Sequence, residues 1–190
     1  LLFLGAGTVI LSLHHEHDIF KMGGKWKKLP IAFASFMIGS LALAAFPFTS
    51  GYFSKDEILL AALAVEGPGL WLWMGGVAGA FLTGLYSFRL VFVVFFGESK
   101  DHHDASEVAG ISMAAPLIIL MVFSVLGGLI QVPVESVFDH GEVHEEHHAS
   151  FLMHAIMIAV PLMGIGISYL FYGAKTFSTD RLMSSSVAKT

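Results

Sequence analysis

Three ionisable residues stand side by side at the end of a long uncharged stretch. Lys55, Asp56 and Glu57 come one residue after 24 consecutive uncharged residues at positions 30–53. An apolar run of this length is typical of a bilayer-spanning segment, and charged side chains at membrane depth are costly and usually functional. Burial favours the neutral form of a lysine, whereas a neighbouring carboxylate favours the ammonium form. A lysine balanced between these effects can bind and release a proton, so the cluster predicts a proton or ion path.

A second interpretation of the same cluster is structural. Ser54 and Glu57 form a capping-box pattern, Ser-x-x-Glu, which predicts that a helix begins at Ser54. If that helix lies at the membrane surface, its charges are only solvated. A lysine in the first turn opposes the helix dipole, which argues against a capping role for Lys55. Spacing alone leaves both interpretations open.

Composition indicates the setting of the cluster. Hydrophobic residues make up 55% of the 190 residues and charged residues 13%, and the mean hydropathy is +0.75. A soluble domain carries about 25% charged residues. We therefore predict an all-α, polytopic transmembrane helix bundle in a lipid bilayer, with no nucleic-acid partner. The absence of cysteine excludes disulfides and thiolate-bound metal or iron–sulfur centres on this chain.

Hydropathy and turn residues divide the chain into membrane segments. We predict a truncated helix, a broken helix, three full spans and a cytoplasmic tail, at 1–14, 30–65, 70–97, 113–132, 151–173 and 174–190. The sequence starts in apolar residues without a polar lead-in. We therefore expect a fragment of a longer protein, incomplete at both ends.

The segment 30–65 is too long for one straight span. As a single helix it would measure about 54 Å, compared with about 30 Å of hydrocarbon. Pro47 and Gly51 lie inside it and favour an interruption. We predict one half-helix that ends near Phe46 and a second that runs from Lys55. Irregular backbone at membrane depth is tolerated only against protein or water, so the break predicts a wet cavity.

The distribution of positive charge predicts an orientation. Eight Lys and Arg residues fall on one side of the membrane, in 21–29, 98–110 and 174–190. The loops on the other side, 66–69 and 133–150, contain none. By the positive-inside rule, the segments 21–29, 98–110 and 174–190 are cytoplasmic.

Two further polar features are weaker candidates. Arg89 lies about 10 Å of helix before Phe96, so its side chain can reach the cytoplasmic headgroups; the alternative is a partner for a buried acid. The loop at 140–148 is rich in histidine and acid, but such polar loops are usually only solvated, and we predict no metal site there. His154, in the first turn of the last span, is interpreted as interfacial.

Small residues indicate where helices approach one another. The pattern Gly75-x-x-x-Gly79, like Gly164 and Gly166 in the last span, is typical of close helix packing in membranes. We expect these glycines to pack against neighbouring helices of the same bundle.

Four segments resemble one family in sequence order. The stretches at 1–10, 14–24, 51–59 and 85–89 resemble the subunit L family of bacterial respiratory NADH:quinone oxidoreductase, complex I, whose mitochondrial counterpart is subunit 5. The resemblance runs over most of residues 1–100, and beyond Asp101 it rests on the pattern of spans.

The resemblance implies a fold and a function. It implies an antiporter-like second repeat, incomplete here, in which Lys55 and Asp56 correspond to the proton-handling lysine–aspartate pair of the broken helix. Glu57 then only caps the helix together with Ser54, after the break at Pro47 and Gly51. The chain would belong to a proton-pumping subunit that couples NADH oxidation and quinone reduction elsewhere in the complex to proton translocation.

The resemblance also implies a cellular setting. No cofactor is expected on this chain, since NADH, FMN, the iron–sulfur clusters and quinone bind other subunits. The partners are the other membrane-arm subunits, and the location is the bacterial inner membrane. The alternatives are a subunit of a multi-subunit sodium/proton antiporter, a non-pumping membrane scaffold, and a metal transporter that collects its ion at the His-rich loop.

Overall fold

Helices account for all the regular structure in the described part of the chain, residues 1–98, 110–129 and 151–174 of a computed structural model. The α-helices are α1 Leu2–Ser12, α2 Pro30–Leu43, α3 Ser50–Leu63, α4 Gly69–Val91, α5 Ile111–Leu126 and α7 Phe151–Ser168. Short turns extend three of them: π-helical η1 Phe92–Phe96 and η3 Tyr169–Gly173, and the 3₁₀ turn η2 Gly127–Leu129. The prediction of an all-α fold is confirmed.

Three of these helices are long and apolar enough to cross a membrane, namely Gly69–Phe96, Ile111–Leu129 and Phe151–Gly173. The predicted spans 70–97, 113–132 and 151–173 overlap them. The predicted helix 1–14 corresponds to the shorter α1. Nearly all of the predicted tail 174–190 and of loop 98–110, and the whole His-rich loop 140–148, lie outside the described residues.

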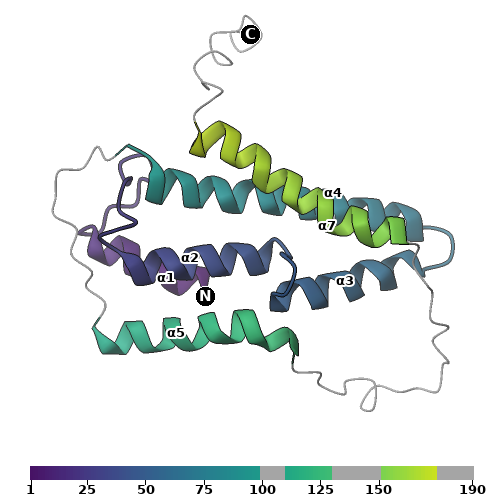
Figure 1. The fold of residues 1–190 in the computed structure, drawn as a ribbon, viewed down its shortest axis with the longest axis horizontal. Coiled ribbons are helices and arrows are strands. Elements are labelled where there is room, and N and C mark those ends of the chain that lie inside the picture. The colour runs from purple at the N-terminus through teal and green to yellow at the C-terminus, as the bar shows by residue number, and fades with distance from the viewer. Residues whose placement is uncertain (99–109, 130–150, 175–190) are drawn as a thin grey trace, which may run out of the picture.

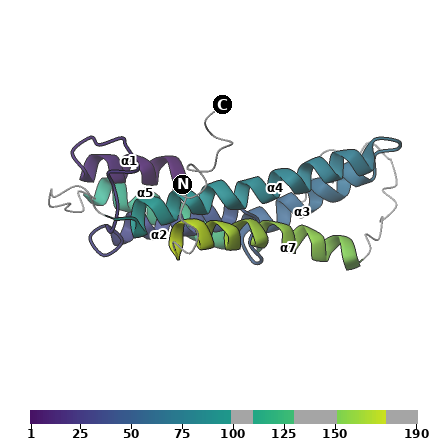
Figure 2. The same ribbon diagram turned by 90° about the horizontal axis from the view of Figure 1, so that it is seen from above.

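The helix α4 is the long axis of the bundle (Figure 1). The shorter helices α2 and α3 follow one another along it, and both contact it. The helices α1 and α5 contact α2, whereas α7 lies along α4 (Figures 1 and 2). Each of α2 and α3 has 14 residues, or about 21 Å. Together they match the length of α4 with η1, Gly69–Phe96, which has 28 residues.

The first half-helix ends in a Schellman motif. The Phe46 N–H donates to the Leu41 carbonyl at 2.9 Å and the Ala45 N–H donates to the Ala42 carbonyl at 3.1 Å. Ala45 takes the left-handed conformation, with φ of 57°. Glycine is usual at this position, and alanine there costs about 1–2 kcal/mol. The helix therefore ends at Leu43, three residues before the predicted end near Phe46, because the left-handed residue turns the chain first.

The second half-helix begins earlier than the capping box predicted. Thr49 is the N-cap, with φ of −96° and ψ of 159°, and its hydroxyl donates to the Phe46 carbonyl at 2.6 Å. Ser54 lies in the second turn of α3 and is exposed, as is Glu57. The prediction that Ser54 and Glu57 cap this helix is wrong. The extended N-cap at Thr49 starts the helix four residues upstream, and Gly51 lies in its first turn rather than in the break.

Two apolar clusters lie on either side of the break. The larger joins α1, the loop after it, α2 and the end of α4 through Val9, Leu13, Met22, Leu29, Ala32, Phe36, Val91, Val94 and Phe95. The smaller joins α3, the start of α4 and α7 through Leu59, Trp73, Val77 and Met157. Each half-helix therefore has its own core. The helix α4 is common to both.

Glycines bring α4 and α7 into backbone contact. A Cβ at Gly84 would lie 2.6 Å from the Pro161 carbonyl oxygen, and a Cβ at Gly164 would overlap the Phe81 carbonyl. The prediction of close packing at Gly164 is thus correct. It is wrong for Gly75, Gly79 and Gly166, where a Cβ would meet nothing within 4 Å. Spacing marked these glycines, but the rotation of each helix about its axis turns them away from the neighbours that the structure describes.

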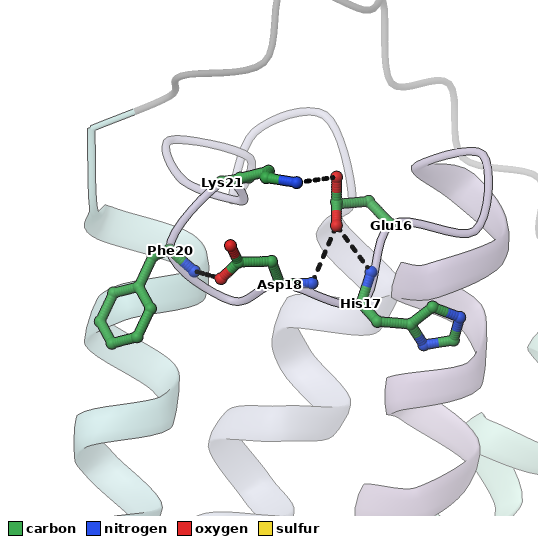
Figure 3. Close-up of polar contacts among 5 residues, drawn as sticks. All are labelled: Glu16, His17, Asp18, Phe20 and Lys21. Atoms are coloured by element: carbon green, nitrogen blue, oxygen red, sulfur yellow. Dashed lines mark hydrogen bonds and ion pairs between the residues drawn. The ribbon is translucent and has the colours of Figure 1, made fainter.

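The loop after α1 is closed by a carboxylate (Figure 3). One Glu16 oxygen accepts from the backbone N–H groups of His17 and Asp18, each at 3.0 Å, and the other lies 3.2 Å from the Lys21 Nζ. The backbone N–H of Asp18 and the Lys21 ammonium lower the pKa of the Glu16 carboxyl. These bonds hold the first part of the loop that connects α1 to α2.

The contact between α4 and α7 generates a first prediction. Gly164→Ala should destabilise the full-length subunit by about 1–3 kcal/mol, because the added methyl group forces the two backbones apart. Gly166→Ala is the matched control, since its Cβ meets open space. Thermal unfolding of the complex containing each variant measures the difference. Equal midpoints for the two variants would contradict the close approach.

Candidate functional site

Lys55 reaches from the second half-helix to the end of the first. Its Nζ donates to the Leu43 carbonyl oxygen at 3.4 Å. Leu43 is the last residue of α2, and carbonyl oxygens at a helix C-terminus carry partial negative charge. The Schellman bonds use the carbonyls of Leu41 and Ala42. The Lys55 ammonium therefore donates to the Leu43 carbonyl, which the Schellman bonds do not use. An ammonium at this position is favoured by both the hydrogen bond and the helix dipole.

Gly51 allows the two half-helices to approach so closely. A Cβ at this position would overlap the Ala42 carbonyl, one residue before the carbonyl that Lys55 contacts. Gly51 was predicted as part of the break. Its observed role is to seat the first turn of α3 against the last turn of α2. Pro47 does lie in the irregular segment between the helices, where a missing backbone N–H removes no helical bond.

Asp56 points to a different helix. Its Oδ2 lies 3.8 Å from the Nε2 of His154, in the first turn of α7. The Asp56 side chain is 19% exposed and the His154 side chain 38%. In the described part of the chain, Lys55 and Asp56 therefore have separate partners on α2 and α7.

Sequence reasoning placed His154 at the membrane interface and gave it no partner. A signal for the contact was present. The charge pattern puts the start of the last span and the end of segment 30–65 on the same side of the membrane. The charge pattern therefore predicts that the two helices lie at the same end of the bundle. It does not predict that Asp56 and His154 contact one another.

Arg89 lies away from this cluster. Its guanidinium carbon is 5.4 Å from the centre of the Tyr172 ring, which follows α7 in η3. Its Nε is buried and has no hydrogen-bond partner among the described residues. The contact that the structure records is thus with an aromatic face. The proposed role as a partner of a buried acid stays a prediction.

The histidines of the described region form no metal site. No group of three or more His, Cys, Asp or Glu residues in 1–98, 110–129 and 151–174 could hold a metal ion. The acidic, histidine-rich stretch 140–148 falls outside these residues.

The arrangement defines a class of protein. Two short helices, α2 and α3, follow one another beside α4, they meet at Gly51, and Lys55 and Asp56 lie just past this meeting point. Broken helices with ionisable residues at membrane depth are the usual way in which transporters form ion sites. The fold and site are those of an antiporter-like membrane subunit.

Comparison with known proteins identifies the family. Residues 1–83 match the family model described as NADH:quinone oxidoreductase/Mrp antiporter, transmembrane region. NADH-quinone oxidoreductase subunit L of Pseudomonas aeruginosa is 46% identical over 180 residues, which cover 93% of this chain and 29% of the relative. Subunit L of Escherichia coli K12 is 42% identical over 184 residues, or 95% of the chain and 29% of the relative.

The chain belongs to the NADH-quinone oxidoreductase subunit L family. The similarity extends past residue 100, where the resemblance had rested on the pattern of spans. The chain spans about 29% of the length of these two relatives.

The close approach at Gly51 generates a second prediction. Gly51→Ala should move α3 away from α2, lengthen the contact between Lys55 and Leu43 and destabilise the full-length subunit by about 1–3 kcal/mol, because the added methyl group overlaps the Ala42 carbonyl. Gly75→Ala is the control, since it adds the same methyl group to open space on α4. Thermal unfolding of the complex containing each variant is the measurement. Equal midpoints for the two variants would contradict the close approach of α3 to α2.

Proposed function

We propose that this chain is part of a proton-translocating, antiporter-like membrane subunit of NADH:quinone oxidoreductase, in which Lys55 and Asp56 transfer the proton. The observation that carries the proposal is the position of Lys55 at the terminal carbonyl of an interrupted helix. The names of the relatives support the complex. The enzyme class is that of a translocase subunit. NADH, FMN, iron–sulfur clusters and quinone bind other subunits, and the partners are the other membrane-arm subunits.

The break offers a way to change the proton affinity of Lys55. While Nζ contacts the Leu43 carbonyl, the end of α2 stabilises the ammonium. A small displacement of α3 relative to α2 removes that stabilisation and leaves a lysine in an apolar setting, which favours the neutral amine. Quinone reduction elsewhere in the complex would drive the displacement.

Transfer must run against the membrane potential. Moving one charge costs about 2.3 kcal/mol per 100 mV. Water access to Lys55 must therefore alternate between the two sides, or protons would flow back. The separate packing of α2 and α3 in two clusters fits such a change at the break.

A sodium/proton antiporter subunit is the second candidate. The matching family model includes Mrp antiporters as well as the oxidoreductase. The two functions differ in their dependence on sodium and on NADH. Proton uptake that requires sodium and proceeds without NADH oxidation would favour the antiporter.

Lys55 is the residue that tests the function. Lys55→Ala in the full-length subunit should lower NADH-driven proton translocation in membrane vesicles, because the group that releases the proton is missing. Lys55→Arg should fail as well, since a guanidinium keeps the charge near Leu43 but does not release a proton. Translocation is measured per NADH oxidised.

Lys27→Ala is the matched control, because it removes a cation from the loop before α2 and leaves Lys55 in place. In that loop the Lys27 Nζ lies over the Trp26 ring, 5.0 Å from its centre. Unchanged translocation in Lys55→Ala with an intact complex would overturn the proposal. Recovery in Lys55→Arg would assign Lys55 a fixed electrostatic role instead.

We further propose that the chain lies in the bacterial inner membrane, with 21–29, 98–110 and 174–190 on the cytoplasmic side. Two contacts support a common side for the first two segments. The Trp26 ring stacks on Phe96 with 6.2 Å between centres, and a Cβ at Gly23 would lie 2.6 Å from the Glu98 carbonyl oxygen. The turn with Glu66 connects α3 and α4 at the opposite end (Figure 1).

Thiol labelling tests the orientation. This chain has no cysteine, so single substitutions add unique labels to it. Lys27→Cys should react with a membrane-impermeant thiol reagent from the cytoplasmic side, and Glu66→Cys from the other. The parent full-length subunit is the background control. Labelling of both positions from one side would contradict the orientation.

A further inference from the structure

His154 is placed opposite Asp56 by packing on both sides of the contact. Leu59 lies three residues after Asp56 on α3, and Met157 lies three residues after His154 on α7, so each shares a helix face with its polar neighbour. Leu59 and Met157 belong to the same buried cluster. The approach of the polar pair is therefore imposed by the apolar core beside it.

The helix α4 closes the third side of this junction. Leu59 packs where Gly76 leaves space, since a Cβ at Gly76 would overlap the Leu59 side chain. Trp73 of α4 is 8% exposed and belongs to the same cluster. The two polar groups therefore lie at the edge of the apolar contact among α3, α4 and α7.

Asp56 is the acid that His154 meets. The distance of 3.8 Å between Nε2 and Oδ2 is within ion-pair range and a small side-chain movement from a hydrogen bond. Of the other charged groups of α3, Lys55 is directed to α2 and Glu57 is exposed. The helix α4 contributes the uncharged Trp73. In the described residues the pair is thus one imidazole and one carboxylate.

The two side chains differ in their access to the surroundings. His154, at 38% exposed, is twice as accessible as Asp56, at 19%. It lies in the first turn of α7, at the end of the bundle where α3 turns into α4 (Figure 1). Histidine is the side chain that gains and loses a proton near neutral pH. These properties suit the outermost group of a proton path.

We propose that His154 is a proton-handling residue that links Asp56 to the end of the bundle opposite the basic loops. This inference rests on the proposed function of Lys55 and Asp56. The proton leaves the Lys55 ammonium and binds the Asp56 carboxylate. It then passes from the Asp56 Oδ2 to the neutral His154 Nε2, and the resulting imidazolium releases it to water. Each step breaks one N–H or O–H bond and forms another, so Asp56 and His154 return to their starting state, and Lys55 does so when it binds the next proton.

The test compares His154→Gln, Asp56→Asn and the double variant in the full-length subunit within its complex. His154→Gln should slow proton transfer through the subunit by about 10²-fold, the usual effect of removing a general acid–base group. The double variant should be no slower than the slower single variant, because both substitutions interrupt one path. NADH-driven proton translocation in membrane vesicles is measured across a range of pH.

Two further variants separate a chemical role from a structural one. His17→Gln is the control, since this histidine lies in the exposed loop after α1. His154→Lys keeps a protonatable group but holds its proton to higher pH, so translocation should recover only under alkaline conditions. Because His154 is more than one third exposed, these substitutions leave the core beside it in place, and assembly is checked by the yield of complex.

The outcomes distinguish the two proposals. Wild-type translocation and an unchanged pH profile in His154→Gln, together with a defect in Lys55→Ala, would overturn the role of His154 alone. Additive losses in the double variant, or a defect that His154→Lys does not change with pH, would also overturn it. Normal translocation in Lys55→Ala would instead overturn the proposed function on which this inference rests.

Discussion

Backbone carbonyls at the end of a helix must find partners outside its own ladder, and the end of α2 meets this requirement in two ways. A continuous helix satisfies its own carbonyls, but α2 stops after 14 residues. The Schellman bonds from Ala45 and Phe46 satisfy two of the exposed carbonyls, and the Lys55 ammonium contacts the next one at Leu43. The charge of Lys55 is therefore tied to the break, since the interruption creates the acceptor that holds it.

The other helices pack against α2 and α3 and hold the two half-helices in place, each in its own apolar cluster. The helix α4 runs beside both half-helices and belongs to both apolar clusters. Its contact with α7 depends on Gly84 and Gly164, which let the two backbones touch. The continuous helices thus frame the break, and α2 and α3 pack in separate clusters on either side of it.

Much of this architecture was predictable from the sequence, and the predictions that failed did so for local reasons. Segment length alone required a break in 30–65, and the apolar runs located the long helices. The capping box at Ser54 failed because a single residue in an extended conformation, Thr49, is enough to start a helix earlier. The glycine pattern at Gly75 and Gly79 failed because spacing predicts a smooth helix face but not which neighbour the face meets.

By itself the sequence determined the membrane setting, the interruption of the helix and the ionisable residues beside it, because hydrophobic length and charge are properties of local sequence. Its similarity to subunit L determined the family. Only the tertiary structure decided that Lys55 reaches the terminal carbonyl of α2 while Asp56 faces His154 on α7. Those contacts depend on the rotation of α3 about its axis and on the close approach at Gly51. Packing between helices distant in sequence sets both, and no local pattern encodes them.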